Sequence, residues 1–403
     1  MNEYVCAFRG RRDNYQVPLA LAEVNLLDQF ITDFYSLSVS QHLFPYLPQH
    51  WQQKINFRSH PGIPSEKVYC LLGKTLQEHL RHKLGWSAAK TYAAFDPVFS
   101  QQAANRARAS RSNLFLYTPY AWEAFRASYS HTPHKVLFQF HPHAEVEESL
   151  LTQDLQRFPQ VEHSYREEVG RDLSPVARKR EQECWKYADL ILCASSFTRD
   201  TLLKAGAKPE SCYVQPYGVN LPVLSNSSPS THFQALFVGS GIQRKGLHHL
   251  LNAWKQAILP EESQLILVCR VLDPGIQTMI AQTPKVRLLQ GVNAEALGQL
   301  YQSSSLLVMP SLIEGFGQVF LEALSYGCPV LGTRNTCLPD LGGESDGVFL
   351  SNVGDLDHLI HQLEHLANYL PSHANIRTNA RACAERFSWQ AFRSSLCRWL
   401  QSP

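Results

Sequence analysis

The stretch PSLIEGFGQVFLEALSYGCPVLGT, residues 310–333, decides the fold because its turn and helix join two short apolar runs, one directly before it and one near its end. The apolar run that ends at Pro310 and the run at residues 328–332 have the length and branching of buried strands. Between them, residues 319–324 are apolar around most of a helix, and Gly327 stands where a C-terminal cap belongs. Strand, turn, helix and strand in this order predict a parallel α/β sheet.

The turn at residues 314–317 predicts a binding site for phosphate. A helix that begins beside glycines exposes unpaired N–H groups at the positive end of its dipole, and an anion can approach them closely. Two carboxylates frame this turn, Glu314 within it and Glu322 inside the helix. A carboxylate in an apolar helix needs a partner, so Glu322 is expected to meet hydroxyls or cations in a cleft. The alternative is a structural glutamate in a salt bridge.

The run EGFGQVFLE, followed by ALSYGCPV, resembles the E-x7-E signature of the family 4 retaining glycosyltransferases. That family has the GT-B fold, in which two Rossmann-like domains with parallel sheets face each other across a cleft. The resemblance implies that Glu314 lies at the transferred sugar and that Glu322 holds the ribose hydroxyls of the donor. The donor diphosphate is then expected on the backbone amides of Gly315, Phe316 and Gly317.

The resemblance also implies a reaction. A sugar would move, with retention, from a nucleotide-diphosphate sugar to a hydroxyl of a saccharide or lipid-linked acceptor, in polysaccharide or glycoconjugate synthesis. Two alternatives remain, a nucleotide-sugar epimerase of the same fold and a non-catalytic nucleotide-sugar-binding protein, because one architecture serves several chemistries. Turnover of the donor alone would identify the epimerase, and a dispensable Glu314 would identify the binding protein.

The chain of 403 residues is long enough for two domains, and its 44% hydrophobic and 18% charged residues are ordinary for globular proteins. A polar Ser/Pro-rich stretch at residues 221–231 predicts a linker, with the boundary near residue 225. We therefore expect two domains, residues 1–225 and residues 226–385, and the resemblance implies that the first binds the acceptor and the second the nucleotide sugar. By resemblance, a terminal helix at residues 386–403 packs back on the first domain.

The first domain opens with a strand at residues 4–8 and a turn at Gly10. The family often has two glycines in this donor-side turn, whereas Arg11 and Arg12 follow Gly10 here. These arginines either contact phosphate or are solvated loop charges. His141 stands just beyond another strand, at the edge where parallel sheets bind ligands, and the resemblance places a histidine near the transferred sugar. A structural role for His141 and a register shifted to His143 are the alternatives.

The second domain begins with a strand at residues 235–239, a loop and a helix, whose apolar face is expected to include Ile258. Arg244 and Lys245 stand immediately before this helix, where two cations can neutralise a leaving diphosphate. The resembling family uses a basic pair in this loop in that way. The alternative is a solvated pair. The arginine that the family often has directly after the strand glycine is replaced by Ser240.

Residues 81–111 carry six basic side chains, one acid and several aromatic residues. This composition fits peripheral contact with an anionic membrane surface, an anionic acceptor, or a solvated helical face over core aromatics. No nucleic-acid-binding motif accompanies it. The sequence has no apolar run of roughly 20 residues, and the stretch MNEYVCAFRGRRDN lacks the apolar h-region that a signal peptide is expected to have. We expect a cytoplasmic protein that can lie at the inner face of the membrane.

No metal site and no cofactor other than the nucleotide-sugar co-substrate are expected. The ten cysteines are scattered without C-x-x-C pairs, which is typical of free core thiols in a reducing compartment. Asp355 and Asp357 match a D-x-D metal motif, but an N-cap at the start of a helix explains them better. Three histidines on that helix have metal-ligand spacing, yet they are expected on its solvated face: His358, His361 and His365.

Overall fold

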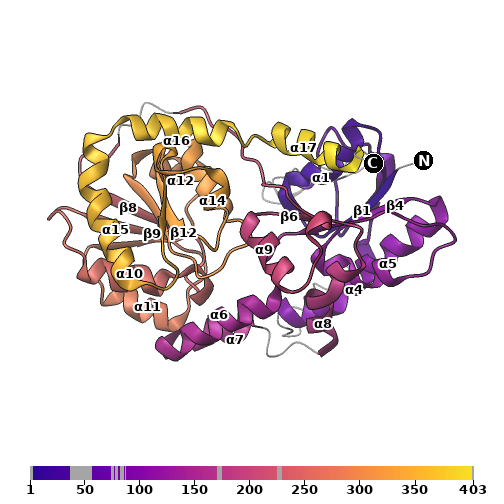
Figure 1. Cartoon of the computed structure of the whole chain (residues 1–403), viewed down its shortest axis with the longest axis horizontal. Helices are drawn as coiled ribbons and strands as arrows, with labels where there is room; N and C mark the ends of the chain where they lie inside the picture. Colours follow the sequence, from indigo (N-terminus) through magenta and orange to yellow (C-terminus); the bar gives the residue numbers. More distant parts are fainter. Residues whose placement is uncertain are drawn as a thin grey trace.

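The structure is a computed structural model that describes residues 3–36, 57–73, 77, 80–81, 86, 88–169, 175–224 and 229–401. In this part of the chain the strands form a seven-stranded and a six-stranded sheet, and every pair of neighbouring strands is parallel. The two sheets lie side by side, each with helices around it (Figure 1). The expected α/β class with two Rossmann-like units is confirmed.

The first sheet has the order β3-β2-β1-β4-β5-β6-β7. Its strands are short apolar runs that are mostly buried, as expected when helices cover both faces of a parallel sheet. They are β1 (Tyr4–Ala7), β2 (Leu27–Thr32), β3 (Val68–Cys70), β4 (Asn113–Tyr117), β5 (Lys135–Gln139), β6 (Leu190–Cys193) and β7 (Cys212–Val214). The connecting helices are α1 (Gln16–Glu23), α4 (Ala88–Ser110), α5 (Trp122–Arg126), α6 (Ala144–Arg157), α7 (Glu162–Glu168), α8 (Pro175–Glu183) and α9 (Ser196–Lys204).

The second sheet has the order β10-β9-β8-β11-β12-β13. Its strands are β8 (Gln234–Val238), β9 (Gln264–Val268), β10 (Val286–Leu289), β11 (Leu306–Met309), β12 (Val330–Thr333) and β13 (Val348–Ser351). Its helices are α10 (Leu247–Gln256), α11 (Pro274–Ala281), α12 (Ala294–Ser303), α13 (Gln318–Ser325), α14 (Leu338–Leu341), α15 (Leu356–Tyr369) and α16 (Asn375–Glu385). Because the strand order reverses between β8 and β11, the loops after these two strands open the crevice in which such sheets bind ligands.

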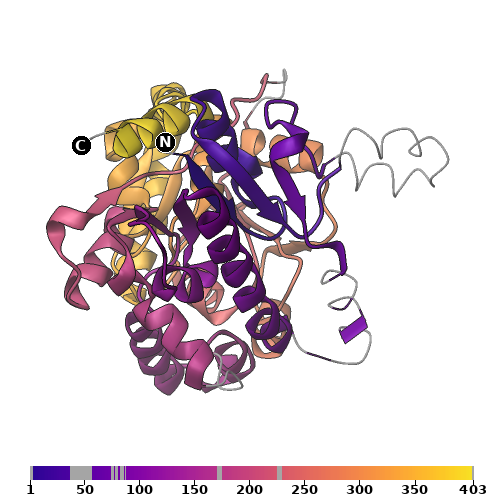
Figure 2. The ribbon, with the colours of Figure 1, turned by 90° about the vertical axis from the view of Figure 1, so that its right-hand side faces the viewer.

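The last helix, α17 (Trp389–Gln401), leaves the second sheet and lies against α1 (Figure 1). Arg393 donates hydrogen bonds from Nη1 to Gln16 Oε1 at 2.6 Å and from Nε to Glu23 Oε2 at 2.8 Å. Figure 2, which views the molecule from the side of the first sheet, shows this yellow helix beside the indigo elements of the N-terminal half. The chain therefore begins and ends in the same half of the molecule.

Several expectations about single residues can be compared with the structure. The Asp355 side chain accepts a hydrogen bond from His358 N at 3.0 Å, so the predicted N-cap is confirmed. All ten cysteines are free. The prediction for Ile258 was wrong, because α10 ends at Gln256 and Ile258 is 85% exposed. The prediction continued the apolar face of the helix beyond Gln256, where the helix ends.

The basic region at residues 81–111 is described in part, and Lys83 lies outside the described residues. Two aromatic residues of α4, Phe95 and Phe99, are buried in the core, while Trp86 is exposed with Arg81 4.4 Å from its ring centre. Among the described helices, none combines the length and the apolar character that crossing a membrane requires.

Candidate active site

The central turn connects β11 to α13 and holds Glu314 at the crevice. Gly317 precedes α13 with φ of +87°, a conformation that glycine adopts without strain. The loop after β12 fixes the turn, because Asn335 O accepts from Glu314 N at 2.9 Å and Asn335 Nδ2 donates to Leu312 O at 2.9 Å. Glu314 is 9% exposed, so its carboxylate is held in a buried position by both neighbouring loops.

Arg244 and Lys245 meet Glu314 directly. They lie in a short 3-10 helix, η8 (Gln243–Lys245), which follows β8. Arg244 Nη1 is 2.9 Å from Glu314 Oε2, and the Lys245 ammonium forms an ion pair with the same oxygen. Gly246, with φ of +69°, directly precedes α10, and a Cβ there would collide with the carbonyl of Pro310. Glycine thus lets the basic loop lie against the central turn.

The electrostatics keep Glu314 ionised. Burial alone would raise the pKa of Glu314, but the charges of Arg244 and Lys245 lower it to about 2. Arg244 is shared with two further acids: Glu168 Oε1 lies 3.0 Å from its Nε, and Glu147 lies 3.8 Å away. Burial raises the pKa of Glu147 to about 7, although Arg244 opposes this shift. The cluster therefore contains a fixed anion, two cations and a carboxyl group that titrates near neutrality.

The central turn is seated on the N-terminal half of the molecule. A Cβ on Gly315 would overlap the carbonyl of Phe140, so only glycine permits this approach. The carbonyl of Gly315 accepts hydrogen bonds from Ser195 Oγ at 2.7 Å and from Thr198 Oγ1 at 3.1 Å. Both hydroxyls come from the N-terminal end of α9. We call the contact surface between the two halves the seam, and it passes through the E-x7-E turn.

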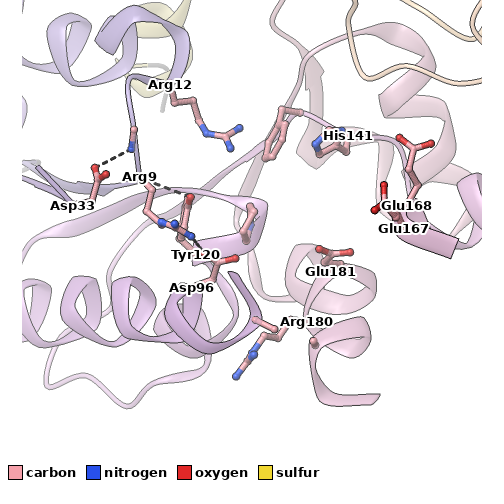
Figure 3. Close-up of a pocket in the computed structure, with 15 residues that line it drawn as sticks. Arg9, Arg12, Asp33, Asp96, Tyr120, His141, Glu167, Glu168, Arg180 and Glu181 are labelled. Carbon is pink, nitrogen blue, oxygen red and sulfur yellow. Dashed lines mark hydrogen bonds and ion pairs between the residues drawn. The ribbon is translucent and has the colours of Figure 1, made fainter. Parts of the chain in front are cut away.

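Phe140 leads directly to His141, which follows β5 and reaches the same seam. The His141 carbonyl accepts from Gln139 Nε2 at 2.7 Å, and the imidazole is exposed to a cavity (Figure 3). Desolvation by the protein around this cavity, followed by the charges of Arg244 and Arg12, lowers the pKa of His141 to about 3. The ring is therefore neutral at neutral pH. Of the two candidate histidines, His143 is buried and pairs with the backbone carbonyl of Gln182 at 3.1 Å.

The cavity has a volume of about 540 Å³, which is in the range of small-molecule sites. Its lining comes from the N-terminal half: Arg9, Gly10, Arg12, Asp33, Ala93, Asp96, Pro119, Tyr120, Phe140, His141, Glu167, Glu168, Ala177, Arg180 and Glu181. A smaller cavity of about 220 Å³ shares His141 and Glu168 with it and extends to Glu147 and Arg244. The two cavities connect the N-terminal half to the basic loop of the second sheet.

Gly10 and Arg12 lie in the turn after β1. Gly10, with φ of +75°, donates from N to Asp33 Oδ1 at 2.9 Å and lines the larger cavity. Asp13, Asn14 and Tyr15 also have positive φ, which costs a non-glycine residue about 1–3 kcal/mol each. This strained turn directs the Arg12 guanidinium over the Phe140 ring, 4.0 Å from its centre, and into the cavity (Figure 3). Burial alone would lower the pKa of Arg12, but nearby groups, Asp13 first among them, raise it, so the guanidinium stays charged.

Glu322 lies on α13, away from the ion cluster. It is half-buried, and Tyr301 of α12 donates from its hydroxyl to Glu322 Oε2 at 3.0 Å. Burial raises the pKa of Glu322, and this hydrogen bond opposes the shift. In the described part of the chain no contact joins Glu322 to Glu314. The structure thus brings Glu314, Arg244, Lys245 and His141 together. Glu322 lies apart from them, on the helix that follows the turn of Glu314.

Sequence reasoning missed three residues at the site, Glu147, Glu168 and Tyr301. The two acids lie in helical stretches that are rich in glutamate, and Tyr301 ends an ordinary amphipathic helix. No local pattern distinguishes them from surface residues. The signal that could have found them is physical: Arg244 and Glu322 need partners if they are buried.

Comparisons with known proteins show what this chain resembles. A family model described as "Glycosyl transferases group 1" matches residues 232–368. The MMP alpha-(1->4)-mannosyltransferase of Mycolicibacterium hassiacum is 27% identical over 210 residues, which are 50% of this chain and 51% of that protein. O-antigen chain mannosyltransferase B of Escherichia coli is 29% identical over 235 residues, 53% of this chain and 60% of that protein. The chain thus spans about half the length of the curated relatives it matches.

Among solved structures, HepE of Anabaena in complex with UDP and glucose superposes with a TM-score of 0.60 and 15% identity, and the match covers 100% of both chains. At this identity the likeness shows the fold. The protein has the GT-B architecture of two facing Rossmann-like units.

Proposed function

We propose that this protein is a retaining, metal-independent glycosyltransferase of the family 4 type. It moves a sugar from a nucleotide-diphosphate sugar to a hydroxyl of a saccharide or lipid-linked acceptor, with no cofactor beyond that co-substrate. The observation that carries the proposal is the meeting of Glu314, Arg244 and Lys245 at the seam between the two halves, beside His141. The relatives named as mannosyltransferases, one of them for the O-antigen chain, support a role in polysaccharide or glycoconjugate synthesis.

The donor diphosphate binds where cations and free amides converge. In the described part of the chain, the N–H groups of Gly315, Phe316 and Gly317 donate no hydrogen bond to the protein, and they precede α13. Phosphate oxygens accept from these amides at the positive end of the helix. Arg244 and Lys245 neutralise the charge that develops on the leaving diphosphate. Glu322, farther along α13, holds the ribose hydroxyls.

The reacting sugar lies between Glu314 and His141. A diphosphate competes with Glu314 for the two cations, which releases the carboxylate towards the sugar ring. There its negative charge stabilises the positive charge that forms as the glycosidic bond breaks. His141 is neutral, so it can exchange hydrogen bonds with a sugar hydroxyl without repelling the cationic ring. The acceptor occupies the cavity of the N-terminal half, whose carboxylates suit hydroxyl groups.

The proposed function is tested by incubating the full chain with UDP-, GDP- and ADP-sugars and following nucleoside diphosphate release with and without a saccharide acceptor. We expect release with one nucleotide class, faster transfer when the acceptor is added, and nearly the same rate in chelator. Release of no nucleoside diphosphate while the sugar is epimerised would contradict the transferase. An absolute need for Mn²⁺ or Mg²⁺ would contradict metal independence.

A lipid-linked acceptor would bring the protein to a membrane, and we include peripheral contact of residues 81–111 with anionic lipid in the proposal. The support is local: Leu80 and Trp86 are exposed, and Arg81 stacks on Trp86. Binding to phosphatidylglycerol vesicles should weaken as salt rises from about 0.01 M, where the screening length is roughly 30 Å, to 1 M, where it is roughly 3 Å. Equal binding to neutral phosphatidylcholine vesicles, or no binding to either, would leave the solvated-face interpretation.

A further inference from the structure

A buried carboxylate of the N-terminal half forms hydrogen bonds with the residues on both sides of Arg244 and Lys245. Asp154, near the end of α6, is 6% exposed. Its Oδ2 accepts from Gln243 Nε2 at 2.9 Å and pairs with His248 Nε2 at 3.0 Å, and its Oδ1 pairs with His249 Nε2 at 2.7 Å. Gln243 precedes the two catalytic cations in the chain, and the two histidines follow them. One carboxylate therefore holds the loop on both sides.

Two further hydrogen bonds and the ring of Phe158 close the same joint. Gln243 Nε2 donates to Leu151 O at 2.8 Å, and Gln243 N donates to Ser164 Oγ of α7 at 3.0 Å. The centre of the Phe158 ring lies 5.0 Å from that of the His248 ring and 4.7 Å from that of the His249 ring, and both pairs are T-shaped. Figure 1 shows α6 and α7 extending from the first half to lie below α10 and α11. The joint is apolar around a polar centre, so its hydrogen bonds are shielded from water.

We propose that Asp154 is a positioning residue that sets the basic loop at the right distance and angle for the donor diphosphate. The inference rests on the proposed function. Side chains as long as those of Arg244 and Lys245 lose much conformational entropy when they are ordered, and a loop that is already fixed lowers that cost. We call Asp154 and its contacts with Gln243, His248 and His249 the clamp. Because Asp154 belongs to the acceptor half, the clamp also keeps the two halves together at the donor site.

The geometry favours hydrogen bonds over a metal ion at this cluster. A metal ion needs several ligand atoms close together. Within the described ranges, one group of His, Cys, Asp and Glu residues meets this condition, and it consists of Asp154, His248 and His249. Metal-bound imidazoles normally donate their other N–H to an acceptor, yet Nδ1 of both rings is buried and has no partner. With the proton on Nε2, each ring instead donates to Asp154, and only a lone pair remains unpaired.

Acid should open the clamp. Burial lowers the pKa of His248, although Asp154 opposes this shift, and the hydrogen bonds from both histidines lower the pKa of Asp154 despite its burial. Among the described residues, two further charged groups lie near the cluster: Asp273, before α11, and Arg157, which donates to Gly354 O beside His249. Because the open state binds protons more readily, the clamp is fully present above the ordinary histidine pKa of about 6.5 and is lost progressively below it.

The test compares Asp154→Asn with Glu148→Gln, which changes an exposed acid on the same helix. Affinity for inorganic pyrophosphate is measured by calorimetry, and amide exchange is followed at residues 243–249. Asn keeps one acceptor oxygen and no charge, so we expect about 10- to 100-fold weaker pyrophosphate binding and faster exchange in that segment. The donor KM should rise more than kcat falls. Glu148→Gln should behave as the wild type.

Two more variants keep the proposal testable if Asp154→Asn does not fold. Ser164→Ala removes only the hydroxyl that accepts from Gln243 N, and it should weaken pyrophosphate binding in the same direction by a smaller factor. His248→Gln keeps an N–H donor for Asp154 without a titrating ring, so it should retain affinity at neutral pH and lose part of the acid dependence.

The outcomes separate this inference from the proposed function. If the wild type neither binds pyrophosphate nor turns over a donor, the proposed function fails, while amide exchange still reports on the clamp. If the wild type is active but Asp154→Asn matches Glu148→Gln in affinity and exchange, the positioning role is overturned. Chelator-reversible thermal stabilisation of the wild type by Zn²⁺ would also overturn it, in favour of a structural metal site.

Discussion

Glu314→Gln is expected to lower kcat by about 30- to 1000-fold while pyrophosphate binding remains equal to that of the wild type or becomes tighter. The carboxylate is ionised and ion-paired to Arg244 and Lys245. The amide cannot stabilise a developing positive charge on the sugar, so the transition state loses about 2–4 kcal/mol. The ground state gains, because the two cations no longer have to leave Glu314 to bind phosphate. Steady-state kinetics and calorimetry measure the two effects separately.

The same substitution should lower the thermal stability of the protein. With Glu314 neutral, Lys245 loses the carboxylate with which it forms an ion pair, whereas Arg244 keeps Glu168. Leaving a buried charge unpaired costs up to about 3–5 kcal/mol, and added pyrophosphate should restore part of the melting temperature. This partial rescue would show that the phosphate site itself is intact when kcat is low.

Glu322→Gln is the matched control, since it removes the other carboxylate of the E-x7-E pair, which the proposed function places at the ribose of the donor. Glu322 should contact the ribose in the ground state and the transition state alike, so its loss should raise the donor KM with little change in kcat. A full kcat in Glu314→Gln, together with unfolding of Glu322→Gln, would mean that both carboxylates are structural. The proposed site would then be wrong.

The sequence predicted the fold well where local periodicity decides it. The run at residues 310–333 indicated the end of a strand, a turn, a helix and a second strand, and in the structure β11 ends just before it, at Met309, and the turn, α13 and β12 follow within it. It also indicated that Arg244 and Lys245 precede a helix. A crossover order that brings β8 beside β11 then places these cations next to Glu314. Motif and local pattern were therefore enough to identify the residues that meet.

The remaining contacts depend on how the two halves meet, which local patterns do not encode. Glu147 and Glu168 share Arg244 across the seam, and Asp154 reaches the histidines of α10 from another helix. The three residues with positive φ after β1 are also invisible to propensity, because tertiary contacts hold them against their local preference. Arg12 enters the cavity as a consequence. Such residues become recognisable only when burial and charge are known together.

Lys245→Ala is expected to reduce kcat/KM for the donor by about 10- to 1000-fold, the scale for losing a charge-assisted contact to a developing anion. Arg244→Ala should lower the stability of the folded protein more than it slows the chemical step. Arg244 lies near three carboxylates, whereas the ion pair of Lys245 is with Glu314. Removing the arginine leaves several buried acids in proximity, and removing the lysine leaves Glu314 with Arg244.

The double variant Lys245→Ala with Glu314→Gln decides whether the pair acts as a unit. If Lys245 only neutralised Glu314, the second substitution would relieve the first, and the double variant would recover towards the wild type. If Lys245 binds the leaving diphosphate while Glu314 acts on the sugar, each loss remains and the double variant is at least as slow as the slower single variant. We expect the second result in kcat/KM and partial recovery in melting temperature. Wild-type rates in Lys245→Ala alone would show that the basic pair takes no part in transfer.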